Sequence, residues 1–186
     1  EPVNKDTVAI IDINNLKSTD WYAISKLYAE AKHRSMPELS IVDVRVFNYF
    51  SHTQDMNARF LITDIVRAIK NKEVFKTSAD NIVRDFITPS DFYGLIQAII
   101  DFKPTNIALD CYTKSPVSKF DLLAELENKL GFKYETNKDV DIVNATGIKT
   151  NYYSTNKMAK QVGYTPVNTS LGGIFKEINF HILGQF

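Results

Sequence analysis

A tyrosine and a lysine four residues apart, Tyr22 and Lys26, are the first side chains in this sequence that could do chemistry together. If the segment is helical, both lie on one face, because positions i and i+4 of an α-helix are neighbours. A nearby ammonium favours the phenolate and lowers a tyrosine pKa from its usual value of about 10. Such a pair can exchange a proton during the interconversion of an alcohol and a ketone near neutral pH.

The spacing alone does not single out this pair. A lysine follows a tyrosine by four residues at three other places, and at least three of the four matches must be accidental. An amphipathic residue at the start of a helix is the alternative interpretation of Tyr22. The other matches are Tyr28/Lys32, Tyr134/Lys138 and Tyr153/Lys157.

Apolar spacing and capping residues predict the helices that would position these side chains. Ser18, Thr19 or Asp20 can cap a first helix over residues 21–35, and Pro37 ends it. The other expected helices span residues 60–70, 91–101 with Ser90 or Asp91 as the cap, 118–130 between Ser118 and Gly131, 152–161, and 170–182.

Strands are predicted between the helices, over residues 41–47, 81–87, 106–111 and 148–153, with a polar loop over 48–57. Helices therefore alternate with strands, which indicates an α/β or α+β fold. The runs at 41–47 and 106–111 are typical of strands buried on both faces, and such strands need sheet neighbours and covering helices. The chain supplies too few of them, which predicts that part of the sheet is absent.

Composition excludes several classes of function. The 186 residues include 22 basic and 22 acidic ones, so the net charge is zero. The net charge therefore gives no electrostatic reason to expect binding to nucleic acid or to an anionic membrane. No apolar run approaches the roughly 20 residues of a membrane span. Cys111 is the only cysteine and the three histidines are scattered, so we expect no disulfide and no metal site. A single unpaired thiol fits the cytoplasm, and we expect Cys111 to be packed at a strand end.

Four segments, in order, resemble the landmarks of one enzyme family. Residues 22–30 are similar to a Tyr-x-x-Ser-Lys-x-x-x-Glu helix, and residues 45–48 to a strand that ends Arg-x-Phe-Asn. Residues 84–91 resemble an Arg-Asp-aromatic-Ile-x-x-x-Asp segment, and residues 156–174 the closing Ser-Lys-Ala-x-x-Leu-Gly-x-x-Pro and Ser-Leu-x-x-Gly-Ile pattern. The chain thus resembles the C-terminal portion of the extended short-chain dehydrogenase/reductase family, of the NAD-dependent sugar-nucleotide epimerase/dehydratase type.

The resemblance implies roles for four residues. Tyr22 would be the catalytic acid/base, and Lys26 would bind the nicotinamide ribose and lower the tyrosine pKa, so both would contact the cofactor, NAD or NADP. Asn48 would contact the sugar nucleotide through its amide. Arg84 would bind the diphosphate, for which a guanidinium offers donors in a planar fork.

Three other charged residues have structural interpretations. Asp85 or Asp91 could form an ion pair with Arg84, which is the alternative to its role in binding phosphate. Asp91 is expected to cap a helix. Arg45 lies within a strand of buried character, so we expect it to have a structural partner there.

The sequence departs from the family pattern at two places. Tyr49-Phe50-Ser51-His52 replaces the usual Val-Tyr-Gly-Pro, which leaves the sugar specificity open. No Gly-x-x-Gly-x-x-Gly or Gly-x-Gly-x-x-Gly turn occurs, and residues 1–60 contain no glycine, although that turn holds the pyrophosphate in the family. We therefore expect an α/β fold, the C-terminal part of a Rossmann-like NAD(P)-binding fold plus a small α/β substrate-binding lobe, with the N-terminal Rossmann half absent.

The expected function follows from this division. Residues 1–50 and 85–113 would be the remnant of the NAD(P)-binding domain, and residues 51–84 and 114–186 the sugar-nucleotide-binding lobe. The whole protein would be a cytoplasmic, homodimeric epimerase, dehydratase or reductase acting on a nucleotide-diphosphate sugar, and this fragment alone would be inactive. A non-catalytic binding or regulatory module derived from the same fold is the alternative. An unrelated α/β domain would be favoured if Tyr22 and Lys26 did not share a helix face that points at a cleft.

Overall fold

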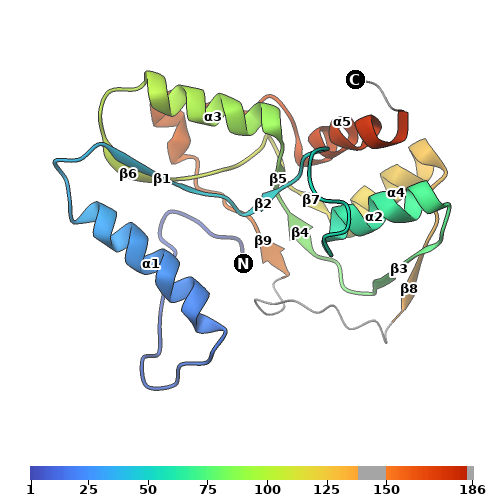
Figure 1. Cartoon of the computed structure of the whole chain (residues 1–186), viewed down its shortest axis with the longest axis horizontal. Coiled ribbons are helices and arrows are strands. Elements are labelled where there is room, and N and C mark those ends of the chain that lie inside the picture. Colours follow the sequence, from blue (N-terminus) through green and yellow to red (C-terminus); the bar gives the residue numbers. More distant parts are fainter. Residues whose placement is uncertain (138–149, 184–186) are drawn as a thin grey trace.

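The computed structural model describes residues 1–137 and 150–183, and its helices and strands form two groups (Figure 1). The first group is a parallel strand pair, β1 (Ile41–Arg45) and β6 (Asn106–Asp110), with α1 (Asp20–Arg34), α3 (Pro89–Asp101) and the 3-10 helix η1 (Met158–Val162). The second group contains α2 (Leu61–Asn71), α4 (Lys119–Leu130) and α5 (Ser170–Leu183), with the pair β3 (Phe75–Ser78) and β8 (Tyr134–Asn137). Short strands connect the groups: β2 (Asn48–Tyr49), β4 (Val83–Arg84), β5 (Phe86–Ile87), β7 (Val117–Ser118) and β9 (Asn151–Tyr152). The class is α/β, as predicted.

Each group is built on its own apolar core. Leu95 of α3, Leu109 of β6 and Ala159 of η1 are fully buried in the first core. The second core joins the three helices α2, α4 and α5 through Ile65, Leu126 and other apolar residues. The helix η1 follows β9 and packs on the first core, so the chain crosses back to the first group before it enters α5. The division into a cofactor-binding remnant and a sugar-nucleotide lobe stays a prediction.

Several helices are confirmed, and α4 is confirmed together with both of its capping signals. The helices expected over 21–35, 60–70 and 170–182 are α1, α2 and α5. Ser118 caps α4 by accepting a hydrogen bond from the Asp121 amide at 3.1 Å. Gly131 ends α4 in the left-handed conformation, at φ +63°, which glycine adopts without steric cost.

The strands differ from the prediction in three ways. The run at 81–87 forms two short strands, β4 and β5, because Asp85 between them is buried and accepts hydrogen bonds from Thr113 and Ser170. The expected loop at 48–57 begins with β2, which pairs in parallel with β5. β3 and β8 were not predicted, since their mixed polar sequences lack a clear period of two.

Two expected helix caps are wrong. Asp91 lies inside the first turn of α3, where its carboxylate accepts from the Val167 amide at 2.7 Å and the Asn168 amide at 3.1 Å. Asp91 therefore holds the turn that precedes α5 against helix α3. At α1, the Asp20 carboxylate accepts from the Lys17 amide at 2.8 Å, and the N-cap residue makes no side-chain cap bond.

The segment around η1 also differs from the prediction. A helix was expected over residues 152–161, but β9 occupies its start and only the five residues of η1 are helical. The expected strand over 148–153 is present as β9, although its first two positions lie outside the described residues.

β1 and β6 are parallel, as predicted, with Ile41 opposite Asn106 and Arg45 opposite Asp110. The residues of β1 are half-buried or exposed, so the expectation of a strand buried on both faces is wrong for it. In residues 1–137 and 150–183 its sheet has only these two strands. Cys111 follows β6 and is 3% exposed, and burial raises the pKa of its thiol to about 12, as expected for a packed cysteine.

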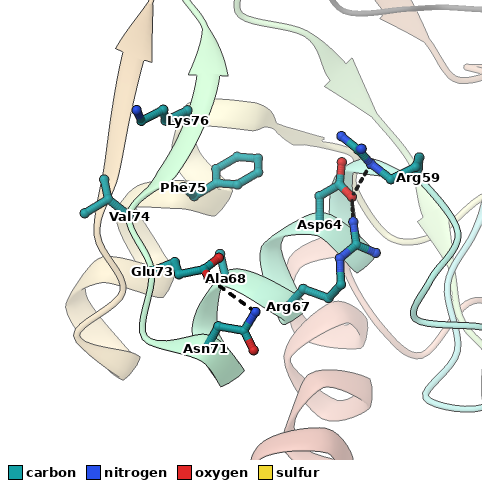
Figure 2. Close-up of a pocket in the computed structure, with 9 residues that line it drawn as sticks. All are labelled: Arg59, Asp64, Arg67, Ala68, Asn71, Glu73, Val74, Phe75 and Lys76. Atoms are coloured by element: carbon teal, nitrogen blue, oxygen red, sulfur yellow. Dashed lines mark hydrogen bonds and ion pairs between the residues drawn. The ribbon is translucent and has the colours of Figure 1, made fainter.

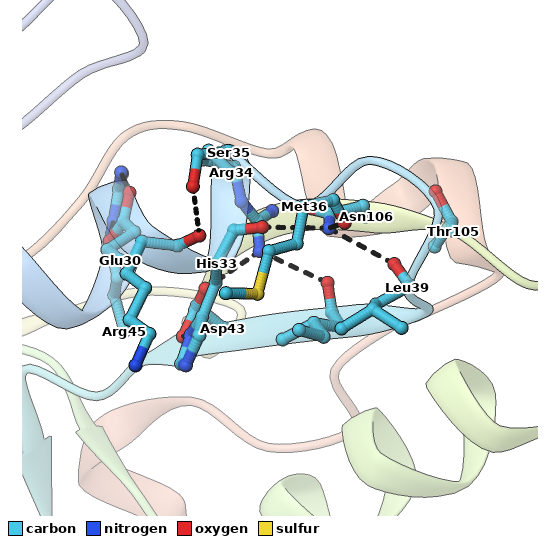
Figure 3. Close-up of polar contacts among 12 residues, drawn as sticks. Glu30, His33, Arg34, Ser35, Met36, Leu39, Asp43, Arg45, Thr105 and Asn106 are labelled. Carbon is cyan, nitrogen blue, oxygen red and sulfur yellow. Dashed lines mark hydrogen bonds and ion pairs between the residues drawn. The ribbon is translucent and has the colours of Figure 1, made fainter.

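Helix α1 is held against this sheet by polar contacts, because none of its residues is buried. Figure 3 shows them at its C-terminal half. Arg45 forms an ion pair with Glu30, with Nε 2.9 Å from Oε2. Arg34 donates to Asp43 Oδ2 at 2.8 Å, and His33 Nδ1 lies 2.8 Å from Asp43 Oδ1.

Asn106, at the start of β6, closes the C-terminal end of α1. Its amide nitrogen lies 2.9, 2.7 and 3.1 Å from the carbonyl oxygens of His33, Met36 and Leu39. A helix end leaves carbonyl groups without intrahelical partners, and Asn106 supplies donors to this one. The strand and the helix are thereby joined by hydrogen bonds.

We predict that Asn106→Ala loosens α1. Losing these hydrogen bonds costs about 1–2 kcal/mol locally, which corresponds to roughly 10-fold faster amide hydrogen exchange in α1. Exchange followed by NMR or mass spectrometry measures this. Asn71→Ala is the matched control, because the Asn71 amide makes a single contact of 3.5 Å to Glu73. Equal exchange rates in wild type and Asn106→Ala would contradict the prediction.

Candidate functional site

Two of the predicted site residues, Asn48 and Arg84, contact the same tyrosine. β4 and β9 are parallel with Arg84 opposite Tyr152, and the guanidinium carbon lies 5.9 Å from the centre of the tyrosine ring. That distance allows a cation–π interaction. The Asn48 amide nitrogen donates to the Tyr152 carbonyl at 3.1 Å. Residues far apart in the sequence therefore meet at β9.

Arg84 is half-buried and anchored through its own strand. One terminal nitrogen donates to the Val83 carbonyl at 2.8 Å and to the Thr150 carbonyl at 3.1 Å. Burial lowers the pKa of the guanidinium, although it stays charged at neutral pH. The alternative partners, Asp85 and Asp91, accept hydrogen bonds from the backbone of residues 113, 167 and 168.

Tyr22 and Lys26 lie on one face of α1. The Lys26 ammonium is 5.4 Å from the centre of the Tyr22 ring, as the four-residue spacing predicts. Both side chains are exposed, and Tyr22 is 65% accessible. The two side chains therefore share a helix face, and the pocket described below contains neither of them.

Tyr152 is the site residue that the sequence interpretation missed. Its ring packs edge-on against Phe47 at 5.4 Å, and its side chain is partly buried. Burial raises the pKa of the Tyr152 phenol, the nearby Tyr22 raises it further, and Arg84 lowers it. Arg84 lies on β4, the strand that pairs with the strand of Tyr152. Its place in a predicted strand just before the closing family pattern was the one signal available.

A chain of charged and polar side chains joins the elements around the site. Arg45, paired with Glu30 of α1, also lies 3.2 Å from Asp110 Oδ1 at the end of β6. Asp110 is fully buried, and its other oxygen accepts from Ser154 at 2.6 Å, two residues after Tyr152. Arg45 has a structural partner, as predicted, and these contacts raise its pKa.

A surface pocket of about 270 Å³ lies between α2 and β3 and contains none of these residues (Figure 2). Asp64 forms ion pairs with both Arg59 and Arg67, so these three charged side chains of the pocket already have partners within it. Its lining is Arg59, Asp64, Arg67, Ala68, Asn71, Glu73, Val74, Phe75 and Lys76.

Neither a membrane-spanning helix nor a metal cluster is found in the described ranges 1–137 and 150–183. No helix there is long and apolar enough to cross a bilayer. No group of three or more His, Cys, Asp or Glu side chains in the same ranges could hold a metal ion.

The ionisation of Tyr152 tests this geometry. We predict that Arg84→Leu raises the pKa of Tyr152, since the guanidinium favours the phenolate, and that Tyr22→Phe lowers it by removing a second phenolate. NMR titration with tyrosine labelled by ¹³C at Cζ measures both shifts. The exposed Tyr93 on α3 is the internal control and should titrate unchanged in each variant. Unchanged titration of Tyr152 in both variants would show that the three groups are not neighbours.

The fold matches solved structures of UDP-sugar 4-epimerases. No protein-family model and no curated protein matches the sequence. UDP-glucuronic acid 4-epimerase from Bacillus cereus in complex with NAD is 16% identical, with a TM-score of 0.72 over 98% of this chain and 56% of that one. UDP-N-acetylglucosamine 4-epimerase from Bacillus cereus is 15% identical, with a TM-score of 0.73 over 100% and 59%. The enzyme of the same name from Methanobrevibacter ruminantium M1, solved with UDP-N-acetylmuramic acid, is 18% identical, with a TM-score of 0.68 over 99% and 63%.

This chain therefore spans 56% to 63% of the length of these three solved proteins. Identities this low establish the fold and leave the activity to be tested. The fold is that of the C-terminal part of the extended short-chain dehydrogenase/reductase epimerases.

Proposed function

We propose that this chain is the C-terminal part of an NAD(P)-dependent epimerase, dehydratase or reductase that acts on a nucleotide-diphosphate sugar. The supporting observation is that Asn48 and Arg84, from two separate family landmarks, both contact Tyr152 of β9. The likeness to solved UDP-sugar 4-epimerases supports epimerisation as the first activity to assay.

Substrate binding is assigned to Arg84 and Asn48. The Arg84 guanidinium binds the diphosphate, because a planar fork of donors matches phosphate oxygens and partial burial strengthens the attraction. Asn48 uses its amide beside the sugar nucleotide, at the position fixed by its bond to the Tyr152 carbonyl.

Proton transfer is assigned to Tyr22. Its phenolate oxygen takes the proton of a sugar hydroxyl when that carbon is oxidised, and the resulting phenol returns the proton when the carbonyl is reduced. The Lys26 ammonium lies on the same helix face, 5.4 Å from the centre of the Tyr22 ring. The exposure of both groups leaves them accessible to substrate and cofactor.

The residues present fit the nicotinamide end of NAD or NADP. Lys26 is an exposed donor on the face that carries Tyr22, which suits a hydrogen bond to the nicotinamide ribose. The dinucleotide, when bound, supplies the acceptor and donor of hydride. The glycine turn that would bind its pyrophosphate is not in this sequence, so we propose that the isolated chain binds it weakly and is inactive.

We also propose a cytoplasmic homodimer formed through α1. The exposed Tyr28 and Ala31 and the half-buried Leu27 lie on this helix, which has no buried residue of its own. Light scattering of the purified protein would measure the oligomeric state.

Arg84→Gln should weaken the binding of UDP to this chain by about 10-fold, because a charged donor to phosphate is lost. Isothermal titration calorimetry measures the affinity. Arg59→Gln is the matched control, since the Arg59 side chain is 83% exposed and lies in the pocket beside α2. Equal losses of UDP affinity in Arg84→Gln and Arg59→Gln would indicate non-specific attraction by surface charge. That result would count against the assignment of Arg84 to the diphosphate.

Tyr22→Phe should lower kcat of the longer protein by at least about 100-fold and leave KM nearly unchanged, because only proton transfer is lost. Oxidised and reduced cofactor can be followed in absorbance with a panel of nucleotide sugars. Tyr28→Phe is the matched control, since Tyr28 precedes Lys32 by the same spacing on the same helix. Full activity of Tyr22→Phe would refute the assignment. Binding of nucleotide sugars without any turnover in the wild type would favour the regulatory module.

A further inference from the structure

The last two turns of α5 contact the loop that follows β2, and a carboxylate and a histidine make the contact. Glu177 Oε2 accepts a hydrogen bond from the His52 backbone amide at 2.9 Å and lies 2.7 Å from His52 Nδ1. Because a carboxylate can only accept, Nδ1 carries the hydrogen. The His52 ring also stacks on Phe180, with ring centres 4.4 Å apart. Glu177 is 8% exposed, so this contact fastens the loop to the helix at a buried group.

His181, one turn after Glu177 on the same helix, has a buried ring nitrogen without a partner. Its Nε2 atom makes no hydrogen bond with any residue in the described ranges 1–137 and 150–183. A neutral imidazole can leave Nε2 without a hydrogen, whereas an imidazolium carries a hydrogen on both ring nitrogens. Protonation of His181 would therefore create a charged, buried donor without an acceptor, which costs free energy.

The groups around His181 also disfavour a charge on its ring. Burial is the largest influence on the pKa of His181, and it lowers that pKa. Lys70, in the last turn of α2, and His52 lower it further, while Glu177 and the backbone of His52 act in the opposite direction. The net effect is a pKa below the ordinary histidine value, so the neutral ring is the form that fits the folded chain.

We propose that His52, Glu177 and His181 form an acid-sensitive latch that fastens the loop after β2 to the C-terminal end of α5. Once α5 detaches, His181 takes up a proton near the ordinary histidine pKa of about 6.5, whereas the docked ring resists protonation. The detached state therefore binds more protons, and docking is complete above about pH 7 and weakens as the pH falls below about 6.5. The latch rests on the fold alone and does not depend on the proposed activity.

Amide hydrogen exchange at about pH 7.5 and about pH 5.5 tests the latch. Protection factors, which remove the intrinsic pH dependence of exchange, should fall at least about 3-fold at the lower pH for residues 176–182, relative to those of α3. His181→Gln, which cannot take up a proton, should abolish this fall, and Lys70→Gln should reduce it. His33→Gln is the matched control, because His33 lies on α1 beside Asp43, and α5 should respond as in the wild type.

Unchanged protection of α5 at the lower pH would overturn the proposal, and so would a fall that persists in His181→Gln. If His181→Gln does not fold, NMR titration of the histidine rings in the wild type decides. His181 should then titrate below the ordinary histidine value, over the pH range in which α5 loses protection. A His181 ring that titrates like a free histidine, or independently of the exchange of α5, would refute the latch.

Discussion

The ion pair between Glu30 and Arg45 joins the helix that carries Tyr22 to the sheet, and the arrangement of the site depends on it. No residue of α1 is buried, so the hydrophobic effect contributes little to its position. An isolated surface ion pair contributes roughly 1 kcal/mol at most, but this one continues into the fully buried Asp110. Burying a charged carboxylate such as Asp110 costs free energy unless a cation pairs with it. The folded state therefore strongly favours the position of Arg45 beside Asp110.

The candidate site lies where the two apolar cores meet. Arg84 and Phe86 are separated by one residue, Asp85, whose buried carboxylate bonds to Thr113 and Ser170 on different elements. Arg84 pairs with Tyr152 of β9, while Phe86 is buried in the core of α2, α4 and α5. The proposed binding residues Arg84 and Asn48 thus lie on short paired strands.

Local signals in the sequence predicted local structure well. Ser118 and Gly131 bound their helix because a cap depends on a few adjacent residues, and the spacing of Tyr22 and Lys26 alone placed them on one face. The role of Asp91 could not be predicted, because its partners are more than seventy residues away. β3 pairs with β8, and Tyr152 gains its neighbours through β4, so both depend on long-range register.

The absence of buried residues in α1 also bears on how a ligand and the fold affect one another. Elements with few buried contacts open at a lower free energy than the core they rest on. Tyr22 is on such an element, whereas Arg84 and Tyr152 are on paired strands. Any molecule that contacts both α1 and these strands, and binds only when α1 is docked, adds its binding free energy to the stability of α1. The proposed substrate would then stabilise the helix that carries Tyr22.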